Sequence, residues 1–88
     1  MKFNTKKVTI RDVEFEIKEL TIGQLMPIVK LMNDDAEAGQ IELMAASIYM
    51  NDEPLGSEYE NLPASMMMKL APHVTEVNNL DDGEEEKL

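Results

Sequence analysis

VTIRDVEFEIKELTIGQLM, residues 8–26, decides the fold because its apolar period changes from two residues to a helical spacing without a linker. The first half alternates apolar and polar side chains, as a half-buried antiparallel strand pair does. Its apolar members are Val8, Ile10, Val13, Phe15 and Ile17. Thr21 and Gln24 then match a capping box, in which each side chain bonds the other residue's backbone amide. The stretch therefore predicts a β-hairpin followed directly by a helix.

The register of this hairpin can be predicted from its side chains. If Arg11 and Asp12 form a two-residue loop, all the apolar residues fall on one face and Lys7 lies opposite Glu16 on the other. Two-residue loops favour Asn-Gly or Asp-Gly, because both central residues need positive φ. Arg11 suits that conformation poorly, so a longer loop remains an alternative.

Helical spacing predicts three helices, over about residues 22–32, 38–50 and 63–78. The first is expected to bury the stripe Ile22, Leu25, Met26, Val29 and Met32, with Ile28 and Leu31 widening it. The second is expected to bury Ile41, Met44, Ala45, Ile48 and Tyr49, leaving Leu43 and Met50 off that face. The third is expected to bury Met66, Met67, Leu70, Val74 and Val77.

Breaks between the helices follow from polar and turn-forming residues. Residues 33–39 form a polar break, and the start of the second helix is left open between Ala36 and Gln40. Residues 51–61 are predicted to form a loop from their Pro, Gly, Ser, Asp and Asn content. Pro27 is expected to kink or tighten the first helix, and Pro72 to bend or split the third. The prediction is one α+β domain over residues 1–80, a hairpin (6–18) packed on three short helices, followed by a disordered acidic tail at 81–88.

The charge of the chain is strongly acidic and unevenly distributed. The net charge is −10, and it divides into +1 over residues 1–20 and −11 over residues 21–88. Such a surface repels phosphate backbones and anionic membranes, so neither nucleic acid nor a membrane is an expected partner. The N-terminus lacks the apolar segment of a secretory signal, and no run is apolar for the eighteen residues that a spanning helix needs.

Residues that could perform catalysis or bind a metal lack the necessary companions. There is no cysteine, and His73 is the single histidine, with no second ligand at metal-binding spacing. The three serines lack the sequence context of a nucleophile, and the acidic clusters do not match a calcium loop. We therefore predict a protein that is not an enzyme and uses no cofactor or metal.

Methionine is unusually abundant, with eight copies in 88 residues. Three in succession at 66–68 cannot all face one core, since helical neighbours lie about 100° apart. A flexible thioether side chain suits a surface that adapts to a partner. The predicted contact residues for an apolar client are Met26, Leu31, Met32, Met44, Met50, Met66, Met67 and Met68. Self-association through the hairpin edge or the apolar helix faces is a further expectation.

Two segments, VTIRDVEFEIKELTIGQLMPIVKLM (8–32) and MKLAPHVTEVNNLDDGEEEKL (68–88), together resemble the small tail assembly chaperones of long-tailed bacteriophages. The first resembles that family in its alternating hairpin and Leu-Thr-x-Gly-Gln-Leu helix start, the second in its Leu-Ala-Pro-x-Val passage before a charged tail. The resemblance implies a non-enzymatic chaperone that binds the hydrophobic, helical tape measure protein and helps recruit tail tube subunits. It also implies a protein of the host bacterial cytoplasm that is absent from the mature virion.

Two other function classes remain open from the residues. An acidic inhibitor that mimics DNA, of the anti-restriction type, would need ordered rows of carboxylates, whereas most acids here lie in predicted loops and the tail. A structural head–tail or minor tail subunit would be present in mature particles, where a chaperone would be missing.

Overall fold

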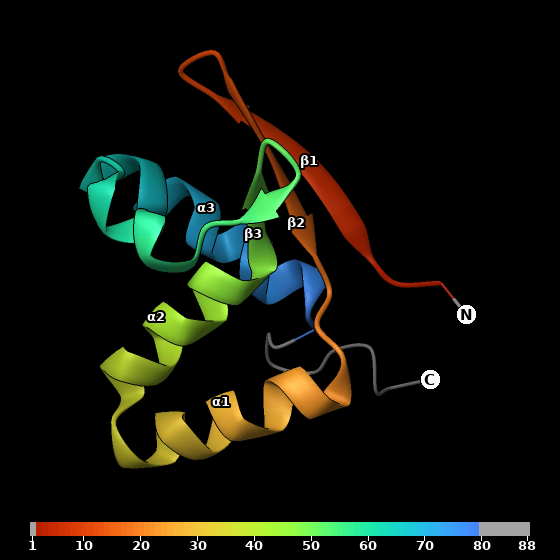
Figure 1. Cartoon of the computed structure of the whole chain (residues 1–88), viewed down its shortest axis with the longest axis vertical. Coiled ribbons are helices and arrows are strands. Elements are labelled where there is room, and N and C mark those ends of the chain that lie inside the picture. The colour runs from red at the N-terminus through yellow and green to blue at the C-terminus, as the bar shows by residue number, and fades with distance from the viewer. Residues whose placement is uncertain (1, 80–88) are drawn as a thin grey trace.

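The computed structural model describes residues 2–79, and these residues form an α+β fold (Figure 1). A four-stranded sheet has the order β1-β2-β3-β4, and each neighbouring pair is antiparallel. In chain order the elements are β1 (Thr5–Ile10), β2 (Val13–Lys18), α1 (Ile22–Asp34), α2 (Ala36–Ser47), β3 (Ile48–Met50), β4 (Glu53–Pro54), the 3₁₀ helix η1 (Gly56–Asn61) and α3 (Ala64–Val77).

The first hairpin has the predicted register. Lys7 pairs with Glu16, and the loop consists of the two residues Arg11 and Asp12. Their φ angles are 53° and 66°, the left-handed conformation that a two-residue hairpin requires. The longer loop is therefore not formed. The Arg11 guanidinium donates to Ser65 Oγ at 2.8 Å, which ties the turn to the start of α3.

A second hairpin replaces the end of the predicted second helix, so the helix over 38–50 and the loop over 51–61 were wrong in part. The helix ends at Ser47, and the next residues form β3, in which Tyr49 pairs with Glu16 of β2. Asn51 and Asp52 form another two-residue turn with positive φ, and β4 and η1 follow. The pairing with β2 satisfies backbone groups that a helix would have satisfied internally, so strand pairing overrides the helical period.

Helix α2 begins at Ala36, the earlier of the two starts that the sequence left open, and the break after α1 is shorter than 33–39 because one residue caps both helices. The amide of Asp35 donates to Leu31 O at the end of α1, and its carboxylate accepts from the Ala38 amide at 3.1 Å. Gly39 lies inside α2, buried against Met32 of α1. The close approach of the two helix backbones explains why glycine occupies this position.

Helix α1 has the predicted capping box and buries part of the predicted stripe: Leu25 and Met32 pack against the core, whereas Ile22 and Met26 are exposed. Thr21 Oγ1 accepts from the Gln24 amide, and Gln24 Oε1 accepts from the Thr21 amide. Ile28 is buried, whereas Ile22 is 79% exposed and Met26 50% exposed. The helix packs mainly on α2, lying away from the hairpin (Figure 1), so it covers less of the sheet than expected. It remains one helix through Pro27.

Helix α3 packs on β1 and β2 through the predicted stripe, with Met66, Leu70, Val74 and Val77 buried. Pro72 does not split it. Leu43 of α2 is 1% exposed and belongs to the same core, contrary to the expectation that it lies off the buried face. The full set of buried hydrophobic residues is Ile10, Phe15, Ile17, Leu20, Ile28, Leu43, Met44, Ile48, Leu55, Met66, Leu70, Val74 and Val77.

Asn78 joins three elements where α3 ends. Its Oδ1 accepts from the Leu20 amide at 2.9 Å, and its Nδ2 donates to Ser47 Oγ and to Val74 O, both at 3.1 Å. Both Asn78 and Ser47 are buried, so these bonds satisfy groups that have little access to water. The predicted disordered tail at 81–88 lies outside the described residues. Over residues 2–79, no helix has the length and apolar character to cross a membrane.

Candidate functional site

An apolar groove lies between α2, η1 and α3, with a volume of about 290 Å³. We call it the methionine groove. It is lined by Glu37, Gln40, Ile41, Met44, Tyr59, Met67, Met68 and Ala71. Most of this lining is aliphatic, thioether or aromatic, so the groove suits apolar side chains rather than a charged ligand.

Helix α2 provides one wall of the groove. Glu37, Gln40, Ile41 and Met44 have the spacing of residues that share one helix face. Met44 is 5% exposed and forms the floor, while Ile41 is half-buried and Gln40 is exposed at the margin. The position of this wall depends on the Asp35 cap, which starts α2.

Helix α3 provides the opposite wall through residues next to its core stripe. Met66 points into the core and is 4% exposed, whereas Met67 is half-buried and Met68 is 76% exposed. A rotation of about 100° per residue separates these environments. The prediction that the three methionines do not all face one core is confirmed, and Met68 with Ala71 forms the outer part of this wall.

Tyr59 closes the groove from η1. It is half-buried, and it lies in the segment that was predicted to be a loop. An aromatic residue within a polar, turn-rich segment was the available signal that this segment folds back on the helices. Asn61 donates to Glu58 Oε1 at 3.2 Å within the same short helix.

The structure brings together three of the eight predicted contact residues, namely Met44, Met67 and Met68. Ile41, Tyr59 and Ala71 also line the groove and were not predicted as contact residues. The other five candidates lie elsewhere: Met26, Leu31 and Met32 on α1, Met50 on β3, and Met66 in the core. The prediction therefore combined side chains from the core, from α1, from β3 and from the groove.

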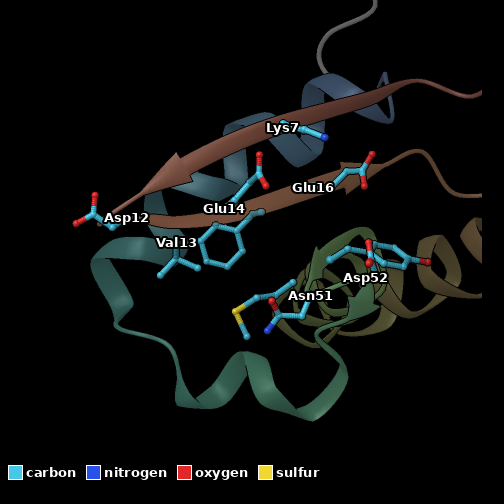
Figure 2. Close-up of a pocket in the computed structure, with 10 residues that line it drawn as sticks. Lys7, Asp12, Val13, Glu14, Glu16, Asn51 and Asp52 are labelled. Atoms are coloured by element: carbon cyan, nitrogen blue, oxygen red, sulfur yellow. The ribbon is translucent and has the colours of Figure 1, made fainter.

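A larger hollow, of about 570 Å³, lies beside β2 where β3 turns away at Asn51. Figure 2 shows Glu14 and Glu16 along β2, Asp12 at the tip of the hairpin, and Asp52 on the opposite turn. Glu14 and Glu16 share β2, whereas Asp12 and Asp52 lie on two different turns. Among residues 2–79, no three His, Asp or Glu side chains are placed to hold a metal ion. Most residues that line this hollow are polar or charged, so it is less suited to an apolar client than the methionine groove is.

One cluster of titratable groups lies on α3 and β1. Lys6 Nζ is 2.9 Å from Glu76 Oε1, and His73 Nδ1 is 3.9 Å from the same oxygen. The hydrogen bond from Lys6 and the charge of Lys6 lower the pKa of Glu76. The Glu76 carboxylate is exposed, and the groups that contact it are the Lys6 ammonium and the His73 imidazole. This arrangement is an ion pair at the surface. The cluster stabilises the contact between β1 and α3.

No family profile, curated protein or solved structure matches this chain. The function is therefore inferred from the geometry of residues 2–79 and from the sequence resemblance. What this geometry can do is bind a few apolar side chains in an adaptable groove on an acidic surface.

Proposed function

We propose that this protein is a non-enzymatic phage tail assembly chaperone that binds an apolar helical client in the methionine groove. The single observation that supports the proposal is a groove lined by methionine, isoleucine and tyrosine on a chain of net charge −10. The apolar lining supplies client affinity, and the charge keeps a chaperone–client complex dispersed in water.

The expected affinity of a single groove is modest. Met68 is the largely exposed apolar side chain at the groove, and completely burying such a side chain contributes about 1.5–3 kcal/mol. Most of this gain offsets the cost of association and side-chain ordering. A long client with many apolar helical segments would bind many copies, so affinity would arise from multiplicity, and each copy could be displaced when tube subunits arrive.

The sequence resemblance supplies the identity of the proposed client and its setting. The client would be the tape measure protein, and the protein recruited around it would be the tail tube subunit. The proposed location is the host bacterial cytoplasm, with the chaperone absent from the mature virion. Self-association through the open edge of β1 is compatible with this role, because bound copies would lie close together along one client.

Co-expression tests the proposal directly. The long coiled-coil product of the neighbouring phage gene is expressed alone, with this protein, or with a variant, and the soluble fraction of that product is measured. Wild type should raise the soluble fraction, and Met68→Asp should abolish the gain by placing a charge in the groove. Met26→Asp is the matched control, because Met26 is also exposed but lies on α1. An insoluble product with wild type, or equal loss with both variants, contradicts the proposal.

The acidic-inhibitor alternative is not favoured by where the carboxylates lie. Helix α3 contains one acidic residue, Glu76, and that residue pairs with Lys6. A DNA mimic would need rows of free carboxylates on such helices. Mass spectrometry of mature particles distinguishes a chaperone from a structural head–tail or minor tail subunit. The structural subunit would be present in the particles, and the chaperone would be absent.

A further inference from the structure

The margin of the methionine groove is acidic as well as apolar. Glu37 lines the groove at the first turn of α2. Glu58 and Glu60 flank Tyr59 on η1, and both are exposed. No lysine or arginine is among the lining residues of the groove, and the nearest in sequence is Lys69, next to Met68.

We infer that the occupant of this groove is an amphipathic helix whose apolar stripe is flanked by lysine or arginine. The inference rests on the proposed function and specifies the chemistry of the client segment. An apolar helix of any charge could fill the groove, but a helix with acidic flanks would meet Glu37 on a chain of net charge −10. Basic flanks would instead pair with Glu37 and be attracted by the net charge, which provides selection by charge as well as by shape.

The length of the groove sets the length of the bound segment. Glu37 and Met44 are seven residues apart on α2, which corresponds to about 10 Å along the helix axis. A client helix lying along this wall would contact it over about two turns. The recognised unit is therefore three apolar residues at i, i+3 or i+4, and i+7, with basic residues beside them.

The expected size of the charge effect follows from exposed ion pairs. Each such pair contributes a factor of about 1.5 to 5 in affinity, and the effect weakens with salt because it is screened over about 10 Å at 0.1 M. The pair with Glu37, together with attraction by the net charge of −10, would give a preference of up to about tenfold for a basic over a neutral helix at low salt, and that preference should fall towards one in 1 M salt.

Three designed 14-residue peptides test the inference. They share one leucine stripe at i, i+3 and i+7, and their flanking residues are all lysine, all glutamine or all glutamate. Affinities for the full chain are measured by fluorescence anisotropy at 20 mM and 1 M salt. The lysine peptide should bind about tenfold more tightly than the glutamine peptide at low salt, with the glutamate peptide weakest, and the three should converge at high salt.

A matched pair of charge variants separates local recognition from general attraction to an acidic protein. Glu37→Gln should reduce the ratio of lysine-peptide affinity to glutamine-peptide affinity about two- to threefold. Glu14 is an exposed residue of β2 outside the groove. Glu14→Gln removes the same charge there and should leave the lysine preference unchanged. An equal effect of the two variants, or equal affinity for all three peptides at low salt, overturns the inference while the groove remains a binding site. If no peptide binds, or if Met68→Asp leaves binding unchanged, the proposed function fails instead.

Discussion

Replacing Gly39 with alanine should loosen the contact between α1 and α2. A Cβ at this position would lie 2.7 Å from both the backbone nitrogen and the Cα of Met32. These atoms belong to the backbone of α1 and cannot move aside by a rotamer change. The helix would therefore have to shift away from α2, its main packing partner.

The magnitude of this effect follows from two opposing contributions. Alanine is better than glycine inside a helix by about 1 kcal/mol, which favours the variant. Overpacking a closely packed site costs about 1–3 kcal/mol, and a clash with backbone lies toward the upper part of that range. We expect Gly39→Ala to lower the free energy of unfolding by about 1–2 kcal/mol.

Urea unfolding followed by circular dichroism measures this change, and the chain contains a matched control. Gly23 is exposed in the first turn of α1, and the nearest atom to its added Cβ is Thr21 Oγ1 at 3.9 Å. Gly23→Ala should therefore stabilise the protein by about 0.5–1 kcal/mol through helix propensity alone. If Gly39→Ala stabilises the protein as much as Gly23→Ala does, the backbones of α1 and α2 do not approach closely enough at Gly39 to exclude a Cβ.

Three other changes test separate contacts by the same unfolding measurement. Asn78→Ala should cost about 2–3 kcal/mol because the buried Leu20 amide loses its acceptor; a change below 0.5 kcal/mol would contradict this. Lys6→Gln should lower the free energy of unfolding at neutral pH, because the lowered pKa of Glu76 makes the ion pair stabilising while Glu76 is ionised. The difference in unfolding free energy from wild type should disappear as the pH falls below 4.5 and Glu76 is protonated. A pH-independent difference would exclude the ion pair as the cause. Asp12→Gly should stabilise by roughly 0.5 kcal/mol, because φ at this position is 66°, and a loss of stability would argue against that turn.

The first hairpin could be predicted from the sequence because its determinants are local. Alternation fixes which side chains share a face, and a shift by one residue would expose the whole apolar set. The Lys7–Glu16 pairing agrees with that register. The loop was harder to predict, since Arg11 and Asp12 adopt positive φ against their ordinary preference. The pairing of two six-residue strands and the Arg11–Ser65 hydrogen bond offset that cost.

The second hairpin and the exposure of Ile22 and Met26 on α1 could not be predicted because they depend on distant partners. Residues 48–50 fit a helical period as well as a strand, and only pairing with β2 selects the strand. Ile22 and Ile28 are equally apolar, so composition does not distinguish the exposed from the buried one. Gly39 was read as part of a polar break, although it permits two helices to approach. The same limit affected the candidate site, where Met66 and Met68 differ only in rotation around α3.

Helix α2 separates the stability of the fold from binding at the methionine groove, and this separation can be tested. Gly39 lies about 200° around the helix axis from both Glu37 and Ile41, so α1 and the groove use opposite faces of α2. Gly39→Ala should therefore reduce stability while leaving the affinity for a leucine-striped helical peptide within about twofold of wild type. Met68→Asp should do the reverse, because a side chain that is 76% exposed contributes little to the core. In the double variant the two effects should add. A loss of peptide affinity in folded Gly39→Ala protein would show that α1 is part of the binding surface, and the groove between α2, η1 and α3 would then be an incomplete description of the site.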